Sequence, residues 1–346
     1  MLTHVYQGVT DLVTSNSLMN FTDLPSVNLD APYWNRNLME SLKVDDRYLL
    51  GYSDFCLSST HCVVFNKDML QNYRLEDPYA LDNKKWTVDK LFSLASAVSE
   101  DNGDGKWTVD DYYGISGWGW VPLITFITSC DMKIVDRDED TGRYYVAYED
   151  NTEKMLSLID KVTTMYKANY SYMWPSVNYT ALKFAEGHSL FQLYSTTGLI
   201  SLATEKIRFG VLPYPKFDEK QENYRSLNWN GLMGVPASVS KAGNPQMVGE
   251  VLELLGYYTG TVKTAYYELQ LGAKVSEAQE DADMLDIIWK SLVSDIGLVC
   301  CNCSGSMDNL VYMLPMICES PKKNFSSFMR SNKSSAQKGL DKVFKQ

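Results

Sequence analysis

The chain has 346 residues, which exceeds the usual size of one hydrophobic core and favours two domains. Its formal net charge is −11, so it lacks the basic balance that a general nucleic-acid binder needs. The same acidity gives no overall attraction to anionic lipid headgroups. No apolar run reaches the roughly 18 residues that indicate a transmembrane helix.

Aromatic residues are abundant, with 23 Tyr and 8 Trp. Their flat apolar faces and polar tips suit stacking against sugar rings or other flat ligands. Packing is the expected role for most of them, including Trp34 and Trp86, because one protein has few binding sites.

Apolar periodicity predicts helices that alternate with short strands, and this alternation indicates an α/β protein. Thr87 is a candidate cap for the first turn of the helix predicted at Trp86–Glu100, and Asn244-Pro245 is typical of a helix start. The predicted strands are Tyr48–Gly51, Cys62–Asn66, Leu190–Tyr194, Phe209–Pro213 and Leu232–Pro236. The predicted helices are Trp86–Glu100, Asn151–Asn169, Gln246–Tyr258, Ala282–Ser294 and Ser335–Phe344.

The segment Glu100–Asp111 matches the spacing of a calcium-binding loop with Gly105 at its sharp turn. A Glu in first place and a short Asp in last place depart from the usual pattern. The alternative is a solvated acidic turn without an ion. The predicted structural Ca²⁺ ligands are Glu100, Asn102, Asp104, the Lys106 carbonyl, Thr108 and Asp111.

The seven cysteines show no regular spacing, so they predict no disulfide framework. Cys300-Cys301-Asn302-Cys303 is dense enough to consider as a metal site, but it lacks the two separated pairs of a structural zinc site. Buried thiols are the favoured interpretation.

Enzyme motifs are poorly represented. Ser238–Lys241 and Ser335–Lys338 both match Ser-x-x-Lys, but no Lys-Thr-Gly or Ser-Asp-Asn accompanies them. The prediction is a protein without catalytic residues. A glycosidase with paired carboxylates stays open as an alternative, because the separation of carboxylates cannot be read from a sequence. A calcium-stabilised interaction module is a further alternative.

Several segments together resemble a known family. Val64–Leu70 is similar to a strand that ends in Asn-Lys, and Trp86–Leu91 to a Trp-Thr helix start. Phe184–Phe191 resembles a helix-Gly-strand step, Phe209–Pro215 a Gly-x-x-Pro-x-Pro connector, and Asn228–Pro236 a returning hinge strand. In this order and spacing they resemble the maltose-binding-protein-like extracellular solute-binding proteins of bacterial ABC importers.

The resemblance implies a periplasmic-binding-protein-like α/β fold with two lobes, hinge crossovers and a ligand in the cleft between the lobes. Lobe one is expected to hold residues 1–57 and 234–273, and lobe two residues 58–233 and 274–346. The implied protein is a monomer that binds a small solute, most often a carbohydrate, and delivers it to permease subunits. It is extracellular and anchored as a lipoprotein. Family members begin with a signal peptide and further strands, so we expect lobe one to be N-terminally truncated here.

Candidate ligand-binding residues follow from the resemblance by position. They lie beside the expected crossovers, in the loop Gly117–Trp120, and before a late helix. Aromatic faces would stack on a sugar, and Asn and Asp side chains would bond its hydroxyls. Packing at the hinge is an equal interpretation for one of them, Trp229. The candidates are Ser59, Thr60, Trp118, Trp120, Tyr194, Trp229, Asn230, Asp308 and Asn309.

Overall fold

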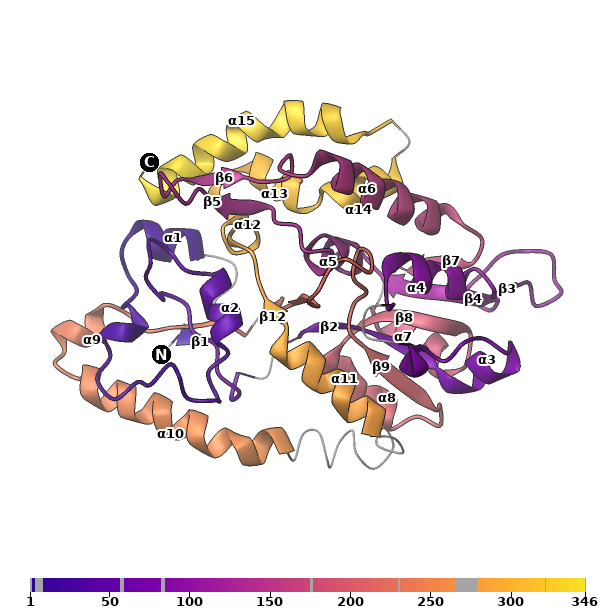
Figure 1. Ribbon diagram of the computed structural model, residues 1–346, viewed down its shortest axis with the longest axis horizontal. Coiled ribbons are helices and arrows are strands. Elements are labelled where there is room, and N and C mark those ends of the chain that lie inside the picture. Colours follow the sequence, from indigo (N-terminus) through magenta and orange to yellow (C-terminus); the bar gives the residue numbers. More distant parts are fainter. Residues whose placement is uncertain are drawn as a thin grey trace.

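The computed structural model describes residues 2–3, 9–56, 59–81, 85–174, 177–229, 231–264, 279–320 and 322–345. Figure 1 shows a larger α/β body and a smaller, mainly helical body at the left, with a layer of helices across the top. The described chain leaves the smaller body after Cys56, returns to it after Trp229 and leaves it again after Thr264. The described helices include no segment long and apolar enough to cross a membrane.

A six-stranded mixed sheet forms the centre of the larger body. β2 is antiparallel to β8 and β9, whereas β4 is parallel to β7 and β8. Every residue of β2 is buried, because helices cover both faces of the sheet (Figure 1). The strands run in the order β3 (Ser99–Glu100), β4 (Tyr112–Trp118), β8 (Ser189–Ser195), β2 (His61–Asn66) and β9 (Phe209–Leu212), with β7 (Ser171–Trp174) also paired to β4.

The helices around this sheet begin at polar caps that the sequence supplies. Thr87 Oγ1 accepts the Lys90 N–H at 3.3 Å, and Asn151 Oδ1 accepts the Lys154 N–H at 3.0 Å. The helices are α3 (Lys67–Asn72), η2 (Pro78–Ala80), α4 (Val88–Ala95), α5 (Val121–Ser129), α6 (Thr152–Lys167), α7 (Val177–Ala185), η3 (Thr196–Gly198), α8 (Leu199–Ala203) and α11 (Gln279–Lys290).

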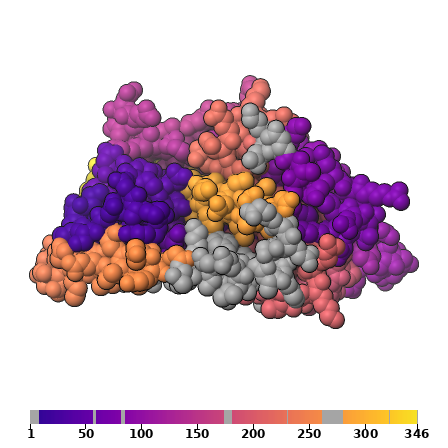
Figure 2. Space-filling view, turned by 60° about the horizontal axis from the view of Figure 1, so that its bottom comes forward, coloured from indigo at the N-terminus to yellow at the C-terminus, as the bar shows by residue number. Residues whose placement is uncertain are grey.

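The smaller body combines the start of the chain with residues 231–264. Gly51 exchanges backbone hydrogen bonds with Met233, and Met19 donates to the Val235 carbonyl. Figure 2 shows the orange α10 lying along the indigo segment, with the amber α11 between this body and the purple residues. Its elements are β1 (Leu2–Thr3), α1 (Val9–Thr14), η1 (Phe21–Asp23), α2 (Arg36–Ser41), β11 (Met233–Gly234), α9 (Ser238–Lys241) and α10 (Pro245–Thr264).

The upper layer of Figure 1 is built mainly from the end of the chain. α15 begins at Asn324, whose side chain accepts the Ser327 N–H at 3.0 Å, and it packs on α13 and on β6. The parallel pair β10 (Ser226–Leu227) and β12 (Leu292–Val293) lies below it. The layer contains β5 (Val135–Arg137), β6 (Tyr144–Val146), α12 (Ile296–Val299), η5 (Cys301–Cys303), α13 (Gly305–Val311), α14 (Met313–Glu319) and α15 (Phe325–Phe344).

Most predicted elements are present, but several limits were wrong. The helix predicted over Trp86–Glu100 ends at Ala95, and Ser99–Glu100 form a strand instead. The helix predicted from Ser335 already begins at Phe325, because a polar stretch of Ser and Asn hides its period. Tyr48–Gly51 is no regular strand and makes only an isolated bridge at Gly51. The predicted division into lobes stays a prediction, since its limits at 57 and 273 fall outside the described residues.

Candidate functional site

Hydroxyl side chains gather where β2 begins and β8 ends. The Thr196 N–H donates to the Thr60 carbonyl at 2.8 Å, and the Thr60 N–H donates to Thr196 Oγ1 at 3.3 Å. Thr197 Oγ1 lies 3.5 Å from Ser59 Oγ and 3.1 Å from Ser195 Oγ. The antiparallel pairing of the two strands therefore brings five hydroxyl residues, from two distant parts of the chain, to one edge of the sheet.

Thr60 is the most unusual member of this group. Thr60 is fully buried, and its side-chain Oγ1 has no hydrogen-bond partner among the described residues. Buried hydroxyls are normally bonded, so this unsatisfied one is an exception at the end of the strand. Its backbone bridges Asn228, and the Trp229 N–H donates to the Ser59 carbonyl at 3.2 Å. The two predicted crossover segments thus lie side by side here.

His61, which the sequence did not single out, supports the hinge tryptophan. Its ring stacks on Trp229 at 6.1 Å with an interplanar angle of 14°. Thr125 Oγ1 contacts His61 Nδ1 and also donates to the Val121 carbonyl at 3.0 Å. Burial lowers the pKa of His61 to about 4, so the ring is neutral at pH 7.

The sequence signal for His61 was a single histidine directly before the apolar run Cys62–Asn66. It does not stand out, because a buried histidine in a strand is commonly a packing residue. Only the sheet order shows that its neighbours are Trp229 and Thr125.

The two loop tryptophans occupy different surroundings. Trp118 ends β4 and is half-buried, in register with Trp174 of β7. Trp120 precedes α5 and is 37% exposed. Its Nε1 donates to Glu319 Oε1, and its ring centroid lies 5.5 Å from that of Tyr312. Gly119 between them has a φ of +55°, which glycine adopts without strain and which lets the chain turn from strand to helix.

The remaining candidates divide into surface and core positions. Asp308 is exposed on α13, and with burial it raises the pKa of Tyr312, so it lies near the Trp120–Tyr312 pair. Asn309 donates to Asn332 Oδ1 of α15 at 3.0 Å, which is a packing contact. Tyr194 is only 4% exposed and donates to the Gly198 carbonyl at 3.2 Å. Asn230 lies outside the described residues.

The structure therefore brings Ser59, Thr60 and Trp229 together and links Trp120 with the neighbourhood of Asp308. Tyr194 packs in a core cluster with Leu199 and Leu202. Both faces of β8 are covered, so a position on either face of this strand places the Tyr194 ring in the core.

The carboxylates of the acidic loop accept hydrogen bonds from the protein itself, mainly from backbone N–H groups of the same loop. Asp111 is fully buried, and its carboxylate accepts the N–H groups of Asn102 at 2.9 Å and of Thr108. Glu100 accepts the Tyr73 hydroxyl at 2.7 Å, and Asp104 accepts the Lys106 N–H at 2.8 Å. Within the described ranges, no group of three or more His, Cys, Asp or Glu is placed to hold a metal ion.

The predicted turn at Gly105 is present, with a φ of +74°. The residue that organises the loop is Asp101, which the predicted ligand set omitted. Its Oδ1 accepts the Gly103 N–H at 2.6 Å and the Gly105 N–H at 3.1 Å. A loop already closed by such bonds needs no ion to hold its shape, so calcium binding stays a prediction.

The cysteine cluster lies in the upper layer, around α12 and η5. Cys300 and Cys301 are buried, Cys303 is partly buried, and all three are free thiols. Burial raises the pKa of Cys303 to about 11, so the thiol stays protonated at neutral pH. These groups are packing residues in this fold.

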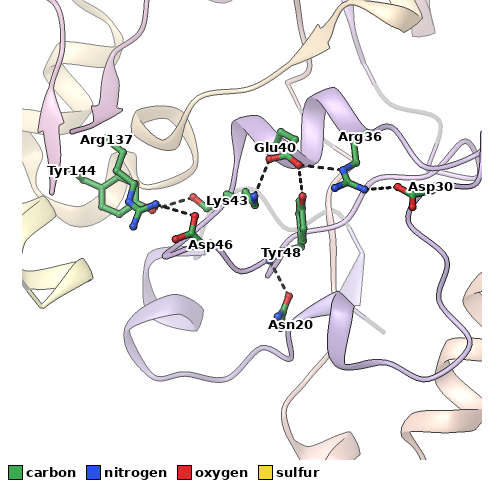
Figure 3. Close-up of polar contacts among 9 residues, drawn as sticks. All are labelled: Asn20, Asp30, Arg36, Glu40, Lys43, Asp46, Tyr48, Arg137 and Tyr144. Carbon is green, nitrogen blue, oxygen red and sulfur yellow. Dashed lines mark hydrogen bonds and ion pairs between the residues drawn. The ribbon is translucent and has the colours of Figure 1, made fainter. Parts of the chain in front are cut away.

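A polar cavity of about 470 Å³ separates the segment around α2 from α5, β5 and the end of β12. Figure 3 shows that charged side chains on its rim are mutually paired. Glu40 pairs with Lys43 at 3.1 Å and with Arg36 at 3.2 Å, and it accepts the Tyr48 hydroxyl. The lining carries five carboxylates and four cations, so it offers no excess of positive charge to a ligand.

Comparison with solved structures adds evidence on the fold. No protein-family model matches the sequence, and no curated protein sequence matches it either. UgpB from Mycobacterium tuberculosis, solved in complex with glycerophosphocholine, matches with a TM-score of 0.61 and 16% sequence identity, over 97% of this chain and 81% of that chain. The sugar-binding protein MalE from Xanthomonas citri matches with a TM-score of 0.61 and 12% identity, over 97% and 84% of the two chains.

The GacH receptor of Streptomyces glaucescens, studied unliganded and with acarbose, matches with a TM-score of 0.57 and 14% identity, over 98% of this chain and 82% of that chain. The chain has the two-lobed, maltose-binding-protein-like fold. The predicted fold class is therefore confirmed. In α/β folds of this kind, ligands bind outside strand ends at the crevice, and the hydroxyl group at Ser59, Thr60 and Thr197 occupies such an edge.

Proposed function

We propose that this protein is the extracellular substrate-binding component of an ABC importer. It captures a small carbohydrate between its two lobes and delivers it to permease subunits without altering it. The observation that carries the proposal is the fold, which is shared over almost the whole chain with the sugar-binding protein MalE, the GacH receptor and ABC-transporter solute-binding proteins. Membrane anchoring through a lipid and a monomeric state belong to the same proposal.

The chemistry at the strand ends supports a polyhydroxy ligand. The hydroxyls of Ser59, Ser195 and Thr197 can each donate and accept hydrogen bonds, which matches the mixed donors and acceptors of sugar hydroxyls. A neutral His61 beneath Trp229 keeps the indole fixed without placing a charge there. Rigid aromatic faces close to neutral hydroxyl groups favour uncharged ligands over ions.

A binding screen tests the proposal. The purified protein is titrated with mono- and oligosaccharides in a calorimeter, and each ligand is analysed afterwards for cleavage products. We expect one sugar class to bind and to be recovered intact. Trp118→Ala should weaken that binding at least tenfold, since stacked aromatics dominate many sites. Trp107→Ala is the matched control, because Trp107 is 46% exposed in the acidic loop.

Two outcomes would contradict the proposal. Release of shortened sugars would establish the glycosidase alternative instead. Absence of binding to every sugar, together with calcium-dependent binding of another protein, would favour the interaction-module alternative.

A further inference from the structure

The last helical segment has an unusual charge. Residues 322–345 contain seven basic residues and one acidic residue, in a chain with 43 acidic and 32 basic residues. α15 buries its apolar side chains, among them Phe328 and Leu340, against the upper layer. Its basic residues therefore lie on the outside of the molecule, where α15 forms the upper edge of Figure 1.

Three of these cations form one stripe. Arg330, Lys338 and Lys342 are exposed and share the four-residue spacing that places side chains on one helix face, with Ser334 between the first two. None of the three cations forms an ion pair with a described residue, whereas Lys333 beside them is paired with Glu149. Unpaired cations are notable here because acidic residues outnumber basic ones in the whole chain.

The stripe borders a groove of about 610 Å³ between α15 and the start of α6. Arg330, Lys333 and Lys338 line it together with the hydroxyl residues Ser326 and Ser334. Glu149 is the acidic residue among its lining groups, and its charge is already neutralised by Lys333. The groove thus keeps a net positive charge, and it offers hydroxyl donors beside its cations.

We propose that this groove binds a phosphate group. A guanidinium donates two parallel hydrogen bonds to a phosphate, an ammonium adds a point charge, and serine hydroxyls supply neutral donors. Arg330, Lys338 and Ser334 provide that combination. The groove is built from α15 and α6, whereas the candidate sugar site is built from the ends of β2 and β8, so the two sites are separate.

The phosphate can come from a lipid headgroup or from a free anion in solution. Both present the same oxygen atoms to the groove. Screening shortens the reach of charges to about 8 Å at physiological salt, so the acidic remainder of the protein does not cancel a local attraction on α15.

The experiment uses the full chain and two double variants. Arg330→Gln with Lys338→Gln removes the cations of the groove. Lys220→Gln with Lys241→Gln removes the same charge from exposed positions elsewhere. Inorganic phosphate is titrated in a calorimeter, and binding to vesicles is measured by sedimentation. One vesicle preparation contains phosphatidylglycerol and phosphatidylcholine, and the other phosphatidylcholine alone. Melting curves establish that each variant is folded.

We expect phosphate or the anionic vesicles to bind and the groove variant to weaken that binding about 30-fold, as expected for two cations at a charged surface. The control variant should bind as the original chain does. Binding to anionic vesicles without free phosphate identifies a lipid headgroup as the source, and the reverse identifies a soluble anion. Failure of both probes to bind, or equal weakening in both double variants, would overturn the proposal.

Discussion

Arg137 and Asp46 join the upper layer to the smaller body, with the guanidinium Nη1 3.1 Å from Asp46 Oδ1 (Figure 3). Asp46 and Asp45 both have positive φ values and form the tip of a tight turn that Val44 and Arg47 close. The Tyr144 hydroxyl accepts the Asp45 N–H at 3.1 Å and donates to the Lys43 carbonyl at 3.1 Å. β5 and β6 thus hold this turn by one ion pair and one buried phenol.

The phenol should matter more than the ion pair. Tyr144 is 2% exposed, so Tyr144→Phe leaves two backbone groups without their partner and should lower the free energy of unfolding by about 1–3 kcal/mol. Arg137→Gln removes an exposed pair and should cost less than about 1 kcal/mol. Urea unfolding measures both. Arg208→Gln, which removes the exposed pair with Asp68, is the control for Arg137→Gln. An equal loss for Arg137→Gln and Tyr144→Phe would contradict this ranking.

His61 should make the stability depend on pH. Its pKa falls from 6.5 to about 4 on folding because burial disfavours the charged ring. The unfolded chain therefore binds this proton more readily, so the stability is lost as the pH falls from 6.5 towards 4. The loss below pH 4 amounts to about 3 kcal/mol.

His61→Asn tests this dependence, because the Asn amide can still donate to Thr125 but does not titrate. Unfolding free energies at several pH values should show the original chain losing stability relative to this variant between pH 6.5 and 4. Gln192→Met, at another buried strand position, serves as the control and should leave the slope unchanged, because neither of these side chains titrates. Parallel curves for the original chain and His61→Asn would show that the ring is not held neutral.

If the proposed sugar site is correct, substitution of Tyr194 should affect stability, whereas substitution of Thr60 should affect sugar affinity. Tyr194→Phe loses the bond to the Gly198 carbonyl and should cost about 1 kcal/mol of stability without changing sugar affinity. Thr60→Val removes the unpartnered hydroxyl and should weaken the sugar affinity measurably while leaving the melting temperature almost unchanged. A weaker affinity for Tyr194→Phe alone would place the ligand beside Tyr194 and not beside Thr60.

The buried amide of Gln192 should make the fold less stable than an apolar side chain of the same length would. It lies in the central strand β8, is fully buried, and neither side-chain Nε2 nor Oε1 has a hydrogen-bond partner. Gln192→Met keeps the length of the side chain and removes the unsatisfied polar atoms, so it should raise the free energy of unfolding by about 1–3 kcal/mol. Val64→Ala, at the residue paired with it on β2, is a cavity-forming control that should lower stability. A loss of stability in Gln192→Met would indicate a bound water at this amide.

Calcium should act on the acidic loop if the predicted site is correct. Binding to the folded chain alone would raise the melting temperature with increasing calcium. Asp104→Asn should reduce this rise, whereas Asp138→Asn in another exposed turn should not. No rise at millimolar calcium after chelator treatment would mean that the bonds made by Asp101 and Asp111 close the loop unaided.

Local features of the fold could be predicted because they depend on neighbouring residues. Thr87 and Asn151 cap the helices that follow them, and the apolar run of β2 forms a strand buried on both faces. Gly105 turns the acidic loop with a positive φ, as its spacing predicted. The resemblance to solute-binding proteins rested on the order of such local segments, and that order is what the fold preserves.

The sequence by itself determined the type and order of most elements it singled out, since capping and periodicity act over a few residues. Only the tertiary structure decided which side chains meet. His61 stacks on Trp229, and Asn309 bonds Asn332, because sheet order and helix packing bring together residues that are distant in the chain. Tyr194 likewise packs in the core with Leu199 and Leu202, because the helix that follows β8 lies against that face of the sheet.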